Sequence, residues 1–222
     1  MIMKKEYANV ADMIFDRGAF KFGAFRLKLH EKNPSAPLSP FYLNLRTKDN
    51  PTNPGPLTDD DCDLIAIALW DKIKLWNIDF QAIAGIPHAA DPIIEALERV
   101  VPKPWGFRII KLAKEIKDGK RKIVPLPGFD YRKGENVLVI DDLVTKADSK
   151  IEAIKAIESE GSIVKKLFVL VDREQGGYFE LRKAGYDMIS CFTIMELLAY
   201  YLATGKIDNE KYEECLCYIE NN

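Results

Sequence analysis

The chain has 222 residues, of which 47% are hydrophobic and 30% are charged, and its formal net charge is −2. This length suits one large domain and hardly two, and the balanced charge excludes the strong basic excess of many nucleic-acid-binding proteins. The N-terminus lacks the apolar core of a signal peptide, and no apolar stretch approaches membrane-spanning length. We therefore expect a cytoplasmic protein that binds neither membranes nor nucleic acid.

The cysteines and histidines are few and are not spaced as metal ligands. The four cysteines, Cys62, Cys191, Cys215 and Cys217, form no Cys-x-x-Cys pair, and the chain has only two histidines. This argues against structural zinc, so we expect reduced thiols.

The first half of the chain predicts a helix, a hairpin and then alternating helices and strands. In chain order the patterns indicate a helix over 5–16, a strand over 25–29, a proline-rich loop over 30–40, a returning strand over 41–46, a helix over 58–75, a strand over 80–84, a helix over 92–100 and a strand over 107–110. Thr58, followed three residues later by Asp61, should cap the second of these helices. Residues 111–122 are rich in lysine and arginine and are predicted to form a loop.

The second half predicts a strand–helix–strand unit and a helical end. Strands are expected over 137–140, 167–171 and 187–191, with helices over 149–161, 177–184, 193–203 and 209–219. Ser149 and Glu152 have the spacing of a capping box. Strands that alternate with helices are typical of an α/β fold with a mainly parallel central sheet flanked by helices, and crossovers in such a sheet are right-handed.

The most informative feature is a pair of carboxylates, Asp141 and Asp142, directly after the buried strand over 137–140. Ligands of open α/β sheets bind at the carboxyl ends of the strands, where the amides of a following helix start attract anions. Carboxylates that accept hydrogen bonds from sugar hydroxyls, next to amides that bind a phosphate, would suit a ribose 5-phosphate. The simpler alternative is a solvated Asp-Asp turn; the hydroxyls of Thr145 and Ser149 and the helix that follows favour the binding site.

Several segments resemble the type I phosphoribosyltransferases, and in particular their orotate branch. VLVIDDLVTKADS is similar to the motif that binds phosphoribosyl diphosphate (PRPP), and GIPHAADP to the pyrophosphate loop. FKFGAFRLKL and SPFYLNLR resemble the N-terminal hood, and VDREQGG with LRKAGYDMISCFTIMELLAYYLATGKI resembles the C-terminal part. The resemblance implies one phosphoribosyltransferase-like domain over residues 1–222, with a hood over about 1–47 plus the C-terminal tail, and a core over about 58–192.

The resemblance also implies an activity. Such an enzyme is a glycosyltransferase (a pentosyltransferase) that transfers the 5-phosphoribosyl group of PRPP to orotate, yielding orotidine 5-phosphate and pyrophosphate in pyrimidine nucleotide biosynthesis. Mg²⁺ is the expected cofactor, held mainly by PRPP and water with no direct protein ligand. The expected partners are PRPP, orotate and a second copy of the chain in a homodimer.

Roles for single residues follow from the same resemblance. Asp141 and Asp142 would bind the ribose hydroxyls, and Asp142 is counted with the catalytic residues. The 5-phosphate would be bound by Thr145, Lys146, Ala147, Asp148 and Ser149. The pyrophosphate would be faced by Ile86, Pro87, His88 and Ala89. The base would be contacted by Lys28, Phe41, Tyr42 and Arg173. Catalytic lysines are expected among Lys111, Lys114 and Lys117, on a mobile loop that closes over the site.

Three departures from the family pattern leave alternatives open. Residues 146–149 replace the usual Thr-Gly-Gly-Ser, no histidine follows the loop lysines, and Ala89 stands where many orotate enzymes have a lysine. Lys111 with Lys114, or Lys114 with Lys117, both fit the lysine spacing. The chain could therefore be a phosphoribosyltransferase for another base, as the long proline-rich hairpin loop suggests, or a non-catalytic nucleotide-binding paralogue.

Overall fold

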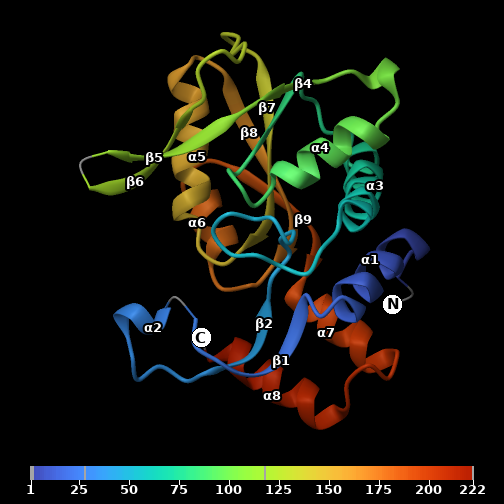
Figure 1. The fold of residues 1–222 in the computed structure, drawn as a ribbon. Coiled ribbons are helices and arrows are strands. Elements are labelled where there is room, and N and C mark those ends of the chain that lie inside the picture. The colour runs from blue at the N-terminus through green and yellow to red at the C-terminus, as the bar shows by residue number, and fades with distance from the viewer. Residues whose placement is uncertain (1–2, 28, 118, 222) are drawn as a thin grey trace.

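A five-stranded parallel sheet forms the centre of the protein in the computed structural model, which describes residues 3–27, 29–117 and 119–221 (Figure 1). Its strand order is β4-β3-β7-β8-β9, and every neighbouring pair is parallel. The strands are β3 (Ala82–Gly85), β4 (Arg108–Ile110), β7 (Asn136–Val144), β8 (Ile163–Asp172) and β9 (Asp187–Thr193). The predicted α/β fold with a mainly parallel sheet is confirmed.

Helices cover both faces of this sheet. Helices α3 (Asp59–Leu75) and α4 (Asp91–Val100) lie on one face, while α5 (Asp148–Ser159) and α6 (Gly177–Lys183) lie on the other (Figure 1). Side chains of β7 alternate between the two cores: Leu138 and Ile140 pack with α3 and α4, and Val137 and Val139 pack with α5. Because successive side chains of a strand point to opposite faces, this alternation also sets the face to which the side chains of Asp141 and Asp142 point.

The two ends of the chain form a second layer below the sheet. It contains α1 (Lys5–Asp16), the antiparallel pair β1 (Phe20–Phe25) and β2 (Ser39–Leu43), the short helix α2 (Leu29–Lys32), α7 (Ile194–Ala203) and α8 (Asn209–Glu220) (Figure 1). Tyr201 joins the ends: its hydroxyl donates to the Ala11 carbonyl at 2.9 Å, and its ring meets Phe20 edge-on at 5.5 Å. The ring of Tyr218 meets that of Phe41 at 6.0 Å. These contacts place the C-terminal helices against the hood strands.

The lysine-rich segment, predicted as a loop, instead forms two antiparallel strands joined as a hairpin. Its strands are β5 (Leu112–Lys117) and β6 (Lys120–Pro125), and a short 3-10 helix (Lys103–Trp105) precedes β4. Leu112 and Ile123 are buried at the base of the hairpin, whereas Ile116 near the tip is 84% exposed. The amide of Ile123 donates to Glu152 on α5 at 3.1 Å. Apolar anchors at the base therefore hold the hairpin to the sheet domain.

Most predicted elements are present in the predicted order, with three corrections. Strand β7 does not end at Ile140 but continues to Val144, so the acid pair lies within it. The prediction of a Ser149 capping box is wrong: Ala147 is the N-cap of α5, and no described side chain caps that helix. The strand predicted over 25–29 lies earlier, because the backbone N–H of Leu27 donates to the His30 ring at 2.9 Å and closes a turn.

The capping box of Thr58 and Asp61 is confirmed at the start of α3. In the described part of the chain, no helix combines the length and the apolar character needed to cross a membrane.

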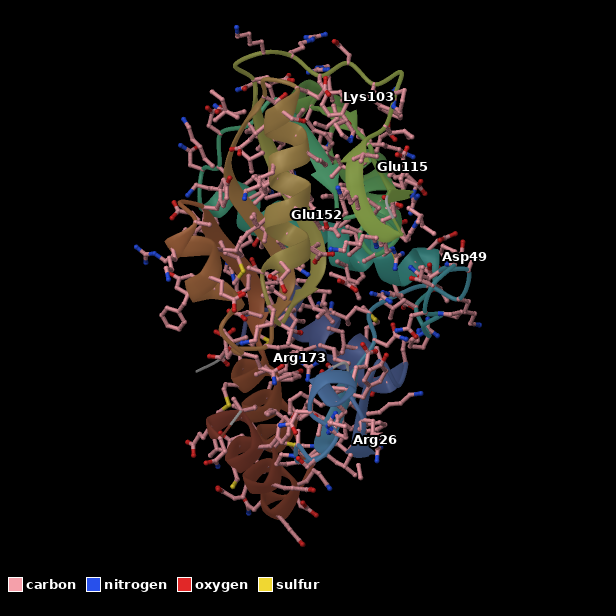
Figure 2. The ribbon with its side chains drawn as sticks, turned by 90° about the vertical axis from the view of Figure 1, so that its left-hand side faces the viewer. Arg26, Asp49, Lys103, Glu115, Glu152 and Arg173 are labelled. Atoms are coloured by element: carbon pink, nitrogen blue, oxygen red, sulfur yellow. The ribbon has the colours of Figure 1, made fainter. Side chains whose placement is uncertain are left out.

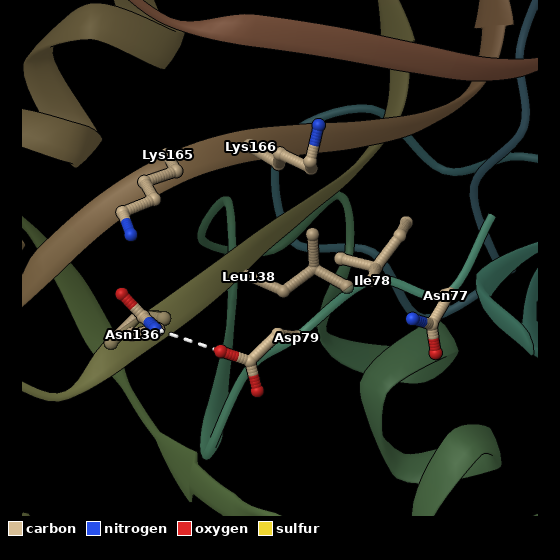
Figure 3. A pocket seen from close by; sticks show the side chains of 8 residues that line it. Asn77, Ile78, Asp79, Asn136, Leu138, Lys165 and Lys166 are labelled. Atoms are coloured by element: carbon tan, nitrogen blue, oxygen red, sulfur yellow. Dashed lines mark hydrogen bonds between the residues drawn. The ribbon is translucent and has the colours of Figure 1, made fainter.

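A pocket of about 200 Å³ opens at the amino-terminal ends of β7 and β8 (Figure 3). Asn136 donates to Asp79 across it at 3.1 Å, and Lys165 and Lys166 line its other side. It lies at the end of the strands opposite to the acid pair and contains none of the residues assigned to the site from sequence.

Candidate active site

The candidate site lies where the chain reverses its direction of winding through the sheet. Strands β3 and β7 are neighbours, but β3 leads to β4 on one side and β7 leads to β8 on the other. Loops diverge at such a switch point and leave room for a ligand at the carboxyl ends of the strands. The loop after β3 is held there, because the amide of Ile86 donates to the carbonyl of Ile140 at 3.0 Å.

The two carboxylates at the end of β7 point to opposite faces of the strand. Asp141 points to the α5 face, where Lys150 Nζ lies 2.7 Å from its Oδ2, and Asp142 lies 3.7 Å from Arg46 Nε. Both residues are buried, and the Asp142 amide donates to the Asp141 carboxylate at 2.9 Å. Burial, and then the nearby charge of Asp141, raise the pKa of Asp142 to about 7. The pair is held in place by two cations from different elements.

The phosphate loop runs from Thr145 to the first turn of α5. The Ala147 backbone has φ −89°, so alanine is tolerated where the family usually has glycine. Its amide does not point to open solvent but donates to Glu180 Oε2 at 2.8 Å, and Lys146 Nζ lies 3.8 Å from Glu180 Oε1. Asp148 is exposed, and Lys150 approaches the Ser149 hydroxyl at 3.5 Å.

The pyrophosphate loop is a tight turn built around His88. Ile86, Pro87 and Ala89 are buried, while His88 has φ 68°, a left-handed conformation that is uncommon outside glycine. Two hydrogen bonds stabilise it: Asn50 Nδ2 donates to the His88 carbonyl at 2.6 Å, and the His88 amide donates to Asp91 at 2.9 Å. Burial raises the pKa of Asp91, and the His88 amide offsets part of this shift.

One lysine of the hairpin reaches this loop. Lys114 Nζ donates to the Pro87 carbonyl at 2.7 Å. Burial lowers the pKa of Lys114 and Arg121 lowers it further, while the charge of Asp141 opposes the shift. Lys111 instead approaches Glu95 on α4 at 3.7 Å, near the surface. Lys117 ends β5, and its side chain lies outside the described part of the chain.

A buried guanidinium lies between the sheet and the hood. Arg173 follows β8, is 5% exposed, and its amide donates to the carbonyl of Val144 at 3.0 Å, which places it beside the end of β7 (Figure 2). Its Cζ lies 5.2 Å from the centroid of the Phe41 ring, yet Nε and Nη2 have no hydrogen-bond partner among the described residues. Burial lowers the pKa of Arg173. Tyr42 lies on the same hood strand, and its hydroxyl accepts from Asn53 at 3.0 Å.

The structure thus gathers most of the predicted site residues at one end of the sheet. Lys28 is outside the described residues. Sequence reasoning missed Arg46, Lys150, Asn50 and Glu180. The role of Lys150 could have been predicted from the sequence, because a lysine in the first turn of a helix that follows an acid pair can reach back to that pair. The other three come from distant segments and left no local signal.

Two further observations concern ions and thiols. The described residues contain no group of three or more His, Cys, Asp or Glu side chains that could hold a metal ion. The four cysteines are free, and three of them are buried.

A parallel sheet with an acid pair and a phosphate loop at its switch point, covered by a hood, defines a phosphoribosyltransferase of type I. The solved structure of Leishmania donovani UMP synthase has this fold, with a TM-score of 0.74 and 28% identity over 97% of this chain and 42% of that one. A Mycobacterium tuberculosis orotate phosphoribosyltransferase solved in complex with PRPP gives a TM-score of 0.60 at 20% identity, covers 87% of this chain and 99% of that one, and supports the fold alone.

Sequence comparison identifies the branch. The orotate phosphoribosyltransferase of Sulfurisphaera tokodaii is 34% identical over 178 residues, which cover 80% of this chain and 83% of that protein. The uridine 5'-monophosphate synthase of Caenorhabditis elegans is 29% identical over 206 residues, 92% of this chain but 37% of that protein. The chain belongs to the orotate phosphoribosyltransferase family. It spans about two fifths of the length of these two synthases, and no family model matches it.

Proposed function

We propose that the chain transfers the 5-phosphoribosyl group of PRPP to orotate, forming orotidine 5-phosphate and pyrophosphate in pyrimidine nucleotide biosynthesis. The observation that carries the choice of base is Arg173. A buried guanidinium with two unpartnered nitrogens is costly unless a ligand completes its hydrogen bonds. Orotate has a planar carboxylate and ring carbonyls, which are the acceptors that the planar fork of arginine binds best.

The surroundings of Arg173 suit a flat aromatic ligand. Phe41 is fully buried under the guanidinium and supports it, while Tyr42, next along β2, is partly exposed. The Tyr42 ring would contribute stacking area to a planar base, while the guanidinium supplies charge and hydrogen bonds. Uracil lacks the carboxylate, so this pocket should favour orotate over uracil.

The neighbouring groups suit the sugar and the leaving group. Asp141 and Asp142 accept hydrogen bonds from ribose hydroxyls, and the amides of the phosphate loop donate to a 5-phosphate. Negative charge grows on pyrophosphate as its bond to the anomeric carbon breaks. The Lys114 ammonium, already positioned at Pro87, stabilises that charge.

Mg²⁺ is proposed as the cofactor. Carboxylate oxygens at the end of β7 are of the kind that Mg²⁺ prefers, but Lys150 and Arg46 already engage them, and the described residues offer no larger acidic cluster. The diphosphate and water would therefore supply most of its ligands, with Asp141 and Asp142 nearby. When bound, Mg²⁺ would neutralise charge on the diphosphate. Activity should disappear with excess EDTA and return when Mg²⁺ is added.

We also propose a homodimer in the cytoplasm. The homodimer follows from the resemblance to the family, and the free cysteines suit a reducing compartment. Sedimentation of the purified protein at several concentrations tests the first proposal, and imaging of a tagged chain tests the second.

The decisive experiment follows orotate absorbance in the presence of PRPP and Mg²⁺. Depletion of orotate, with formation of pyrophosphate, supports the proposal. A panel with uracil and purine bases under the same conditions identifies a different acceptor. No turnover over a wide range of PRPP concentrations, together with nucleotide binding by calorimetry, would instead identify a non-catalytic paralogue.

A further inference from the structure

A carboxylate of the protein itself occupies the phosphate loop. Ala147 N donates to Glu180 Oε2 at 2.8 Å, and Lys146 Nζ lies 3.8 Å from the other oxygen. Glu180 lies 33 residues further along the chain, on α6. An amide at the start of a helix is the kind of donor that binds phosphate. Glu180 therefore takes one of the groups that a 5-phosphate would need.

Close packing brings α6 to this loop. The amide of Gly177 donates to the carbonyl of Thr145 at 3.1 Å, and a Cβ on Gly177 would lie 2.5 Å from Val144 Cγ2. Only glycine allows this approach. Leu181 is fully buried and anchors the same helix. The base of the Glu180 side chain is therefore held beside the loop by its neighbours.

The Glu180 contact differs from the other amide–carboxylate contacts of the site, which are local. The His88 amide donates to the carboxylate of Asp91, three residues on, and the Asp142 amide donates to that of Asp141, the preceding residue. Such local contacts are common where helices begin. Glu180 comes from a separate element, and its side chain is 43% exposed. It can turn into solvent without moving the backbone.

We propose that Glu180 is an internal competitor of the ligand's phosphate, and that its displacement sets the affinity of the loop for PRPP. The inference rests on the proposed function in one respect, namely that the 5-phosphate binds this loop. A carboxylate and a phosphate repel each other and need the same donors, so they exclude one another at the Ala147 amide. Lys146 can pair with either anion. A phosphorylated ligand binds by replacing Glu180.

Two variants and one control test this inference. Glu180→Gln removes the charge and keeps the shape, and Glu180→Ala removes the side chain beyond Cβ. Glu98→Gln is the control, because Glu98 is an exposed glutamate on α4. Affinity for inorganic phosphate is measured by calorimetry, the KM for PRPP is measured with orotate in excess, and thermal unfolding is followed without ligand.

We expect both Glu180 variants to bind phosphate about threefold to tenfold more tightly than the unmodified protein, since one charged competitor for a hydrogen bond is removed. The KM for PRPP should fall by a similar factor, and Glu98→Gln should change neither quantity.

Phosphate affinity that is unchanged or weaker in Glu180→Gln would overturn the inference and show that Glu180 supports the loop. Tighter phosphate binding without any orotate turnover would leave the inference intact and reject the proposed function instead.

Discussion

Replacing Arg173 by methionine should stabilise the free protein while removing its ability to bind orotate. In the free protein, Nε and Nη2 of Arg173 are buried, and the part of the chain that the structure describes offers them no hydrogen-bond partner. An unsatisfied buried polar group costs about 1–3 kcal/mol, and the contact with the Phe41 ring returns about 0.5–2 kcal/mol. Methionine keeps the apolar stem and has no charge to desolvate. We expect a gain of about 1 kcal/mol, or about 2–4 °C in Tm.

The same change should be costly for catalysis. Loss of one partner of a buried, hydrogen-bonded charge pair costs about 2–5 kcal/mol. At about 1.36 kcal/mol for each factor of ten, kcat/KM for orotate should fall by roughly 30-fold to roughly 5,000-fold. A single substitution would thus move stability and activity in opposite directions, as expected when a charge is buried for a ligand.

Thermal unfolding with and without orotate, together with orotate turnover, measures both effects. The unmodified protein should melt at a higher temperature with orotate, whereas Arg173→Met should not respond. Arg99→Met is the matched control, because Arg99 pairs with Asp63 at the surface, where such pairs contribute about 0–1 kcal/mol. The reasoning is refuted if Arg173→Met lowers Tm without ligand, or if it keeps the orotate KM of the unmodified protein.

Three further substitutions test the site. Asp142→Asn should raise the free energy of unfolding more at pH 8 than at pH 5. The Asp142 carboxyl has a pKa of about 7 in the folded protein, so the stability that depends on its protonated form is lost as the pH rises through 7. Urea unfolding of both proteins at the two pH values measures the difference. Lys114→Ala should lower kcat about 10²- to 10³-fold, and Lys111→Ala should change it little. Lys150→Met should lower the free energy of unfolding by about 3–5 kcal/mol, because it leaves Asp141 buried and unpaired.

Each of these has a result that contradicts it. Equal effects of Asp142→Asn at the two pH values would mean that Asp142 is already ionised at pH 5. A larger loss of activity in Lys111→Ala than in Lys114→Ala would favour the register of Lys111 with Lys114 over that of Lys114 with Lys117. An unchanged urea midpoint in Lys150→Met would mean that solvent reaches Asp141.

Local patterns in the sequence were sufficient for the strands and helices of the sheet domain. The apolar run before Asp141, the helix after it and the next apolar run became β7, α5 and β8, because burial on both sides of a parallel sheet requires such runs. The exceptions are segments whose structure depends on contacts with residues distant in the sequence. Glu152 does not cap α5 but accepts from the hairpin amide of Ile123, and the hairpin itself forms because Leu112 and Ile123 are buried against the domain.

For the site, the amino-acid sequence specifies which chemical groups occur at the carboxyl end of β7 and after β8, since the order of elements in a parallel sheet brings those ends to one edge. The partners of these groups follow from the folded arrangement and not from local sequence. Lys150 and Arg46 flank the acid pair, Lys114 reaches Pro87, and Glu180 takes the Ala147 amide. Charge pairing acts over a few ångströms in space, and residues from five separate segments meet within that range only once the chain has folded.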